Sequence, residues 1–472
     1  MSRSISLAWQ ALLGAAALGA LAPSGVAAQA RPAHRKAASA PKLSIPFTMD
    51  TLPNGLTVIV HEDHSVPVVA VNVWYHDGSG DEEVHRTGFA HLFEHLMFMG
   101  SEHAPYPTFD RLLEAAGADN NGSTTEDRTN YYENGPANAL PLMLWLEADR
   151  MGWLLPTMDS AKVDLQRDVV KNERRQRVEN QPYGKAWDAL PGAMFPPGHP
   201  YSWPVIGSMV DLSAASLEDV KNFFRKYYAP DNATLVIAGD VTAASVLAQV
   251  RKYFGDIPRG PAITRPVTPV FHLAKDTVLV LEDRVQLPRL YYMWHTTKAY
   301  APDDAPLNVL AYILAGAKNG RLSQPLVYEQ QLASDVNAFQ DGKLRDGQFG
   351  IIATARPGHA LPELQKVIEA QIDRLAKDGP TAHELEQAKN SYEASTLSQL
   401  EYGSNVADQL NAYYYFTGTP DYLSQDIART RAVTAADVQR VAHQYLAAPR
   451  VVLSVVPEGK TELAAQAAEV TP

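Results

Sequence analysis

Two histidines and one glutamate have the types and the spacing to do chemistry in this sequence. His91, Glu94 and His95 form an H-x-x-E-H motif within an otherwise apolar stretch. A helix of 3.6 residues per turn places positions i, i+3 and i+4 on one face. Two neutral imidazoles on one face could be two ligands of a tetrahedral zinc site, and the carboxylate could take a proton from a metal-bound water. A lone histidine on an apolar helix is usually packed or on the surface. Three hydrophilic groups on such a helix are costly without a purpose, and therefore predict a metal site.

The rest of the ligand set is not fixed by local spacing. Zinc requires at least one more protein ligand and an open position for water. The chain contains no cysteine, so this ligand must be a histidine or a carboxylate. His85 and His103 are near the motif, but their spacing is not diagnostic, and carboxylates are many. From the residues alone the third ligand remains open.

Length and composition limit the class of protein. The 472 residues suggest two or more domains. A hydrophobic content of 46% and a charged content of 20% are ordinary for a soluble globular protein. The net charge of −12 gives no electrostatic support for binding nucleic acid.

The N-terminus predicts export. Arg3 precedes a mostly apolar run, Leu7 to Leu21, and an A-x-A site ends at Ala30. This pattern is typical of a secretory signal peptide, residues 1–30, cleaved near Ala30, with a bacterial periplasm as the destination that fits best. The alternative is an uncleaved membrane anchor, for which the run is short. Residues 31–45 are basic and rich in Ala and Pro, and we expect a disordered lead-in. We expect no membrane span in the mature chain.

Two strands and a charged helix are predicted around the motif. Leu56 to His61 and Val66 to Tyr75 are rich in Val and Ile and precede it. Residues 161–178 are predicted to form a helix with charges on most faces and a thin apolar stripe. Glu173 lies on this helix, which composition alone would assign to a solvated surface.

A polar segment, Asp119 to Tyr132, follows the motif and allows two interpretations. It is rich in Thr and Asn and ends in aromatic residues. It could be an ordinary loop. It could also be a polar edge strand beside the active site, with free backbone groups that pair with an extended peptide. The sequence favours neither interpretation.

The chain is predicted to consist of two halves. We expect an N-terminal metal-binding domain over residues 46–256 and a C-terminal related domain over residues 275–460. Residues 257–274 hold several prolines and no helical period, so we interpret them as a linker. Residues 461–472 form a tail.

A sequence echo indicates that the halves are related. Ser216 begins a helical pattern with a tyrosine eleven residues later, Tyr227, and Thr434 does the same with Tyr445. The echoes are 218 residues apart, close to half the mature chain. Two coincidentally similar helix starts are the alternative. The second half lacks the H-x-x-E-H motif, so no such metal site is expected there.

The sequence resembles the pitrilysin-like metallopeptidases, which carry an inverted zinc motif. It is more closely similar to their short two-domain branch, which includes the mitochondrial processing peptidases. The segments that carry the resemblance are Pro53 to Thr57, Gly88 to Ser101, Asn121 to Thr125 and Arg167 to Glu173. The last corresponds to the family's helix with the third ligand, which maps onto Glu173, 78 positions after His95.

The resemblance implies a zinc endopeptidase. One Zn²⁺ per chain would be held by His91, His95 and Glu173, with Glu94 as the general base. Peptide substrates would bind extended at an edge near Asn121, Gly122, Ser123 and Thr124. The implied fold is α+β, with two related halves, each a mostly antiparallel sheet packed with helices, that form a clamshell.

Two departures from the family pattern concern the site. An acidic residue seven positions before the third ligand is replaced by Gln166, a candidate to orient the ligands through its amide. The Arg and Tyr that hold the substrate carbonyl in active members correspond to Val327 and Ser334. In the two-domain branch these tasks can be split between subunits. We therefore expect the zinc subunit of a heterodimer, whose related partner supplies the Arg and Tyr.

Two other functions remain open at this stage. The missing Arg and Tyr would also fit a zinc-retaining scaffold or peptide-binding chaperone that has lost catalysis. The intact Glu94 argues against that function, since a structural zinc site needs no base. A self-sufficient homodimer with substitutes elsewhere in the chain is the third possibility.

Overall fold

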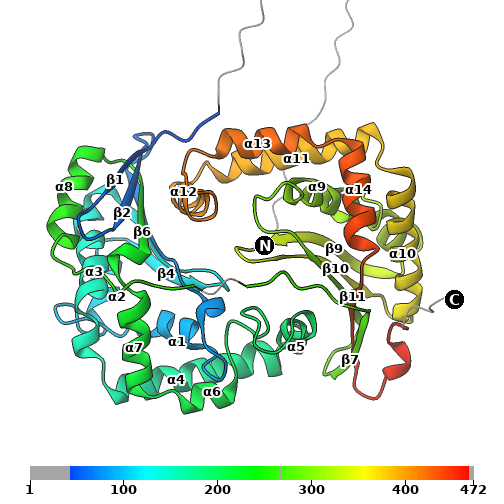
Figure 1. Cartoon of the computed structure of the whole chain (residues 1–472), viewed down its shortest axis with the longest axis horizontal. Coiled ribbons are helices and arrows are strands. Elements are labelled where there is room, and N and C mark those ends of the chain that lie inside the picture. The colour runs from blue at the N-terminus through cyan, green and yellow to red at the C-terminus, as the bar shows by residue number, and fades with distance from the viewer. Residues whose placement is uncertain (1–42, 266–267, 467–472) are drawn as a thin grey trace, which may run out of the picture. The chain divides into compact units, whose positions relative to one another are not determined.

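The computed structural model describes residues 43–265 and 268–466, shown in Figure 1. The predicted signal peptide and most of the predicted lead-in lie outside the described residues. Leu43 and Ile45, at the end of that lead-in, pack into an apolar cluster. Among the helices of the described ranges, none combines the length and the apolar character needed to cross a membrane.

The first sheet has six strands in the order β1-β2-β6-β3-β5-β4. Their bounds are β1 Thr48–Thr51, β2 Thr57–Glu62, β3 Val68–Tyr75, β4 Asp119–Thr124, β5 Thr129–Pro136 and β6 Ala233–Gly239. The β2–β6 pair is parallel and the other pairs are antiparallel. The polar segment Asp119 to Tyr132 therefore forms a hairpin, in which β4 is the edge strand and the end of the segment begins the interior strand β5.

The second sheet has five strands in the order β7-β11-β8-β10-β9. Their bounds are β7 Thr277–Asp283, β8 Arg289–Thr296, β9 Ala333–Gly342, β10 Gly347–Ala355 and β11 Arg450–Pro457. The β7–β11 pair is parallel and the others are antiparallel, as in the first sheet without β1. This shared order confirms the α+β fold with two related halves. The edge strand β9, the counterpart of β4, was not predicted.

Fourteen α-helices accompany the sheets in the described part of the chain. Those of the first half are α1 Phe89–Leu96, α2 Thr108–Ala115, α3 Leu140–Trp153, α4 Ser160–Arg174, α5 Gly184–Met194, α6 Met209–Ala214, α7 Leu217–Tyr227 and α8 Ala243–Phe254. Those of the second are α9 Asp304–Ala315, α10 Leu361–Asp378, α11 Ala382–Gln399, α12 Gly403–Thr417, α13 Leu423–Ala432 and α14 Ala435–Leu446. The helix predicted over 161–178 is α-helical only to Arg174 and continues as a wider π-helical turn, Arg175–Asn180.

The predicted sequence echo corresponds to matching helix starts. Ser216 caps α7 in a capping box with Asp219, and Thr434 caps α14 in a capping box with Asp437. Each box satisfies backbone N–H groups that have no partner within the helix. Each helix then leads to an interior strand of its sheet, β6 or β11. The similar sequences at Ser216 and Thr434 therefore form equivalent elements in the two halves.

Each sheet is also covered by a helix from the other half. Val406 and Leu410 of α12 belong to the same buried cluster as Val236 on β6. Leu190 of α5 belongs to the same cluster as Leu453 on β11. Figure 1 shows α12 beside β6 and α5 beside β7. Because burial of apolar area is the main favourable term in folding, this exchange binds the two halves together.

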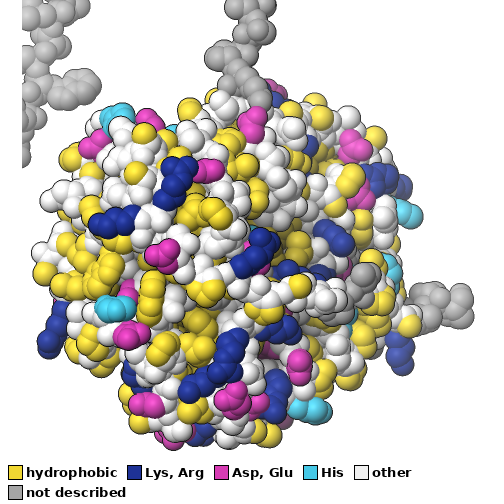
Figure 2. All heavy atoms as spheres, turned by 60° about the vertical axis from the view of Figure 1, so that its left-hand side comes forward, with side chains coloured by type: hydrophobic (Ala, Val, Ile, Leu, Met, Phe, Trp, Pro, Cys, Tyr) yellow, Lys and Arg dark blue, Asp and Glu magenta, His cyan; other side chains and the backbone are white. Residues whose placement is uncertain are grey.

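Charges of both signs are mixed on the surface. On the face shown in Figure 2, Lys and Arg side chains lie among Asp and Glu. Exposed pairs occur on the surface of the described chain, such as Arg225 with Glu218 at 2.9 Å. Pairs of this kind contribute little stability each, about 0–1 kcal/mol.

Candidate metal centre

The motif helix α1 starts at a position that only glycine suits. Gly88 has φ +89°, and a Cβ there would lie 2.8 Å from the Ile206 carbonyl oxygen. The backbone N–H groups of Gly88 and Ala90 donate to the Glu82 carboxylate, at 3.0 and 2.8 Å. Glu82 thus accepts hydrogen bonds from two backbone N–H groups at the N-terminus of the helix that carries both histidines. Sequence reasoning missed this role, although an acidic group just before a helix could have indicated it.

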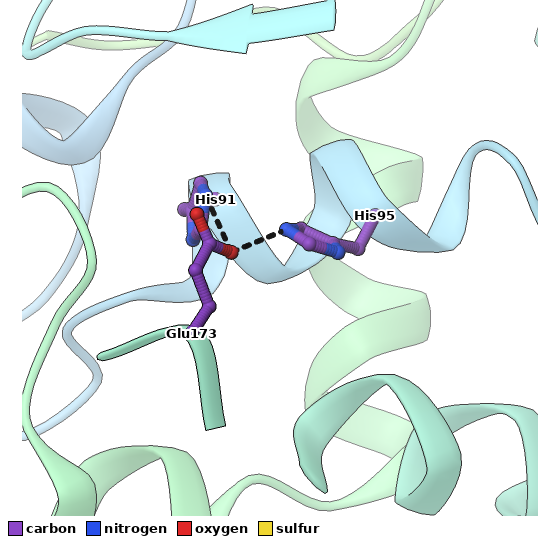
Figure 3. A group of neighbouring side chains, drawn as sticks. All are labelled: His91, His95 and Glu173. Carbon is purple, nitrogen blue, oxygen red and sulfur yellow. Dashed lines mark ion pairs between the residues drawn. The ribbon is translucent and has the colours of Figure 1, made fainter. Parts of the chain in front are cut away.

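The structure brings His91, His95 and Glu173 together from α1 and α4, as Figure 3 shows. Their donor atoms lie within 4.8 Å of one another. Glu173 Oε2 is 3.7 Å from His91 Nε2 and 3.1 Å from His95 Nε2. Two ligands about 2.1 Å from a tetrahedral zinc are about 3.4 Å apart, so both spacings fit the ion.

The protonation of His91 and Glu173 also suits a metal. Burial, helped by His95, lowers the pKa of His91 to about 4, so this imidazole is neutral at pH 7. Burial by itself raises the pKa of Glu173, but the hydrogen bond to His95 and the neighbouring His91 and Arg177 outweigh it, so the pKa lies below its usual value. A neutral imidazole and an ionised carboxylate are the forms that bind a metal.

Gln166 does not orient these ligands directly in this structure. Its Nε2 lies 2.8 Å from the sulfur of Met99. Among the described residues it makes no hydrogen bond to His91, His95 or Glu173. His91 Nδ1 is buried and has no hydrogen-bond partner in the same part of the chain. Metal-binding histidines usually donate this second N–H, so the site differs here from the common pattern.

Glu94 lies against the edge strand β4. Thr124 Oγ1 donates a hydrogen bond to Glu94 Oε2 at 2.5 Å. Burial raises the pKa of Glu94, and the hydrogen bond from Thr124 opposes that shift. A Cβ on Gly122 would lie 3.2 Å from Glu94 Cγ, so this glycine allows the strand to approach the carboxylate. A general base needs this combination of partial burial and one fixed contact.

The other two residues predicted at this edge point elsewhere. The Ser123 hydroxyl donates to Asn130 Oδ1 at 2.7 Å and receives a hydrogen bond from Arg128. Asn121 is exposed, and its side chain accepts from the backbone N–H of Gly122. Side chains alternate along a strand, which explains why Gly122 and Thr124 share the Glu94 side. Beyond β4 no further described strand pairs, so β4 is the edge strand on this side of the sheet.

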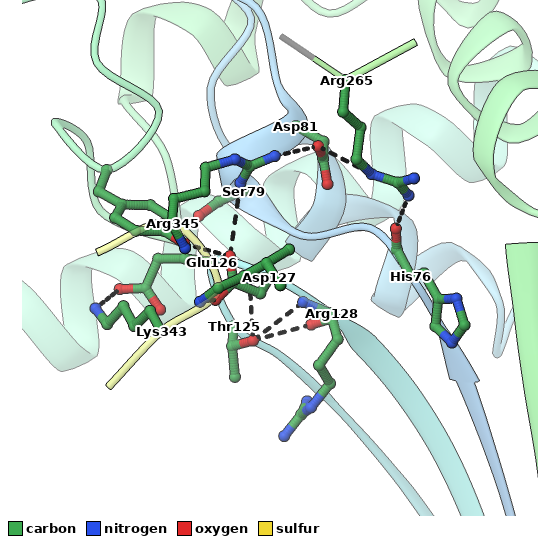
Figure 4. Close-up of polar contacts among 12 residues, drawn as sticks. His76, Ser79, Asp81, Thr125, Glu126, Asp127, Arg128, Arg265, Lys343 and Arg345 are labelled. Carbon is green, nitrogen blue, oxygen red and sulfur yellow. Dashed lines mark hydrogen bonds and ion pairs between the residues drawn. The ribbon is translucent and has the colours of Figure 1, made fainter. Parts of the chain in front are cut away.

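The turn between β9 and β10 holds the β4–β5 turn in place (Figure 4). The Asp127 carboxylate accepts from Leu344 N at 2.8 Å and from the Tyr201 hydroxyl at 2.5 Å. Arg345 Nη2 lies 2.6 Å from Asp81 Oδ1, and Lys343 pairs with Glu126. Contacts from the second half therefore fix the strand that touches Glu94.

Val327 lies before the second sheet's edge strand, and Ser334 lies at the start of it. Val327 belongs to a π-helical turn, Gln324–Glu329, and Ser334 is the second residue of β9. Ser334 Oγ donates to Asp335 Oδ2 at 3.0 Å. Neither side chain carries the guanidinium or phenol that the family pattern has at these positions.

Two family models match consecutive parts of the chain. Residues 57–197 match the model described as Insulinase (Peptidase family M16). Residues 214–392 match the model described as Peptidase M16 inactive domain. His91, Glu94, His95 and Glu173 all lie in the first match.

Proteins with similar sequences and structures agree with these matches. The zinc protease PqqE of Helicobacter pylori is 30% identical over 84% of this chain and 89% of its own length. A probable mitochondrial-processing peptidase subunit beta of Arabidopsis thaliana is 25% identical over 88% of this chain and 79% of its own. The crystal structure of a protease from Helicobacter pylori superposes with a TM-score of 0.83 and 28% identity, covering 88% of this chain and all of that one.

Proposed function

Since this chain belongs to peptidase family M16, the insulinase family, and is a zinc protease, we propose that it cleaves extended peptides with Glu94 as its general base. Zinc would be held by His91, His95 and Glu173, one ion per chain. The observation that carries this proposal is the convergence of the three donor atoms within 4.8 Å, two of them from the helix that also carries the half-buried Glu94 carboxylate. The metal needs a base to take the proton of the attacking water, and the base needs the metal to make that water acidic.

Glu94 performs the proton transfers in this proposal. When bound, zinc would polarise the scissile carbonyl and make the attacking water more acidic. Glu94 takes the proton of that water and passes it to the leaving amine. Thr124 holds the carboxylate in one orientation through its 2.5 Å hydrogen bond. The outer edge of β4, residues 121–124, pairs with the substrate backbone and aligns it beside Glu94.

A related subunit would complete the site. We propose a heterodimer in which this chain provides the metal and its partner provides the Arg and Tyr that Val327 and Ser334 replace here. Donors placed at a developing oxyanion contribute several kcal/mol to catalysis, about 3–4 for one donor. The isolated chain should therefore be weakly active. We also propose that the chain is exported after cleavage near Ala30, which rests on the sequence of the first 30 residues alone.

The deciding experiment separates the base, the metal and the partner. The mature chain is purified with and without its co-purifying partner, and cleavage of a quenched unstructured peptide is measured together with zinc content. Glu94→Gln should abolish hydrolysis and keep zinc, whereas Glu173→Gln should lower zinc affinity. Glu114→Gln, at an exposed position on α2, is the control for the same chemical change. If the Glu94→Gln protein still hydrolysed the peptide, Glu94 would not be the general base. If the isolated chain were fully active, no partner subunit would be needed.

A further inference from the structure

A cavity of about 590 Å³ lies between the two halves beside the metal centre. One wall comes from residues 177–206, including Trp187 and Leu190, and the other from the second sheet, including Arg289 and Met293. Arg177 also lines it, and its Nη1 is 3.0 Å from Glu173 Oε1. The cavity therefore adjoins the candidate metal centre through Arg177.

Most charges around the cavity are already paired. Lys343 pairs with Glu126 and lies 3.4 Å from Asp341. Figure 4 shows the Lys343 and Glu126 side chains directed at each other. Asp188 pairs with Arg174 at 2.7 Å. Lys343 is thus shared by two carboxylates and Arg177 pairs with Glu173, so Arg289 is the one lining cation that has no carboxylate within 4 Å among the described residues.

Arg289 lies at the start of β8. Its guanidinium carbon lies 3.6 Å from the centre of the Tyr183 ring. Its Nε donates to Thr354 Oγ1 at 2.8 Å, and the Thr354 hydroxyl donates in turn to Asp335. Within the described ranges no carboxylate lies within 4 Å of Arg289, and the Tyr291 hydroxyl is a further polar neighbour of its guanidinium.

The platform under Arg289 is built at a cost. Tyr183 has φ +65°, a conformation that non-glycine residues rarely adopt and that costs of order 1 kcal/mol or more. Its hydroxyl donates to the Leu287 carbonyl at 2.9 Å, which fixes the ring. A stacked guanidinium held at Nε presents its two terminal nitrogens in a fixed plane. That arrangement matches the two oxygens of a carboxylate.

We propose that this cavity is a carboxylate-binding subsite for peptide substrates, with Arg289 as the residue that determines the preference. The proposal rests on the peptidase function proposed above and adds its substrate class, namely peptides that place a carboxylate in this cavity. The carboxylate is that of an Asp or Glu side chain or of a free C-terminus, which share the same chemistry. The aromatic and apolar walls contact the neighbouring part of the peptide.

The test measures binding in a chain that cannot cleave. Glu94→Gln protein loaded with zinc is titrated into fluorescein-labelled peptides, and Kd is read from anisotropy. In one series of peptide pairs, the two members carry either Glu or Gln at one position, and each pair tests a different position. In a further pair, one member has a free C-terminus and the other an amidated C-terminus. We expect the carboxylate form of at least one pair to bind about 10- to 100-fold more tightly, and the responsive pair identifies the source.

Variants at Arg289 assign the preference to this cavity. Adding Arg289→Gln should bring the affinity ratio of the responsive pair close to one, and Arg289→Lys should retain part of it, because the charge remains and the fork is lost. Arg374→Gln, which removes an exposed positive charge on α10, should leave the ratio as it was. Thermal unfolding identifies a variant that fails to fold, in which case the Lys variant decides.

Two results would overturn the subsite. One is an equal affinity for both members of every pair in the parent protein. The other is a ratio that persists in folded Arg289→Gln protein. Neither result bears on Glu94 and the metal, because cleavage of a neutral peptide by the Glu94-containing chain is measured separately. A further outcome is that the neutral peptide stays uncleaved even with the partner present, while one peptide pair still shows the affinity ratio. In that case the peptidase mechanism is wrong and the carboxylate site is supported.

Discussion

Gly122→Ala should displace the general base without removing the metal. The added Cβ would lie 3.2 Å from Glu94 Cγ, 3.2 Å from the Asn130 carbonyl oxygen and 3.3 Å from Tyr131 Cδ1. Ordinary carbon contacts are about 3.5–4.0 Å, so a neighbour must move by about 0.3 Å or more. Asn130 offers strand backbone and Tyr131 is fully buried, so the Glu94 side chain is the group that can move. The crowding costs about 1–3 kcal/mol if nothing relaxes.

The expected effect is on rate. A displacement of about 1 Å can cost about 100-fold in rate, so a shift of a few tenths of an ångström should lower kcat/KM by about 10-fold. The assay is peptide cleavage with zinc content and thermal unfolding measured on the same samples. Gly192→Ala on α5 is the matched control, because its Cβ would meet only the Ser202 carbonyl oxygen, at 3.7 Å. A folded Gly122→Ala protein with kcat/KM within twofold of the parent would contradict this account of Glu94, and loss of zinc would shift the defect to the metal ligands.

Three further predictions concern stability and the metal. Asp127→Ala should lower the free energy of unfolding by about 2–4 kcal/mol, because Leu344 N and the Tyr201 hydroxyl lose their buried acceptor. The control Asp164→Ala, at an exposed position, should lower it by less than about 1 kcal/mol. Urea unfolding measures both variants, and equal losses would contradict the role of the turn. The hydrogen bond from Arg321 is the main cause that lowers the pKa of Glu384 from an ordinary 4.5 to about 2, so its stabilisation is fully present above pH 4.5 and is lost as the pH falls through 2. With its side chain 22% exposed, Glu384→Gln should cost roughly 1–2 kcal/mol near pH 6 and almost nothing near pH 2, and a pH-independent difference would argue against the ion pair. Chelation should abolish cleavage and lower the unfolding temperature, with both restored by added zinc, and a metal-free chain that still cleaves would remove the metal from the mechanism.

Local periodicity explains why part of the site was predictable. The spacing of His91, Glu94 and His95 places them on one helix face wherever that helix lies. The capping boxes at Ser216 and Thr434 are also local, and so the repeated architecture could be anticipated. The edge strand β9 was missed because its polar sequence has no strong alternation, and its place is decided by pairing with β10.

The exchange of helices between the halves was not predictable either. Val406 and Leu410 on α12 are simply apolar positions of an amphipathic helix in the sequence. Whether they cover their own sheet or the other one depends on chain connections and on complementary surfaces. The same holds for Leu190 on α5.

The sequence by itself determined a helix face with two imidazoles and a carboxylate, a repeated helix start in the two halves, and a polar segment able to be an edge strand. Those features follow from spacing and from alternation along the chain, which need no knowledge of distant residues. For Glu173 the residues alone left the choice open and only the family resemblance pointed to it; tertiary structure decided its distances to His91 and His95, the contact of Thr124 with Glu94, and the place of Arg289 at a cavity beside the metal centre. These contacts join residues from 30 to more than 100 positions apart, as in the pair Thr124 and Glu94. Their geometry is set by how the two sheets and their helices pack, because side-chain burial acts between surfaces and leaves no periodic trace in the sequence.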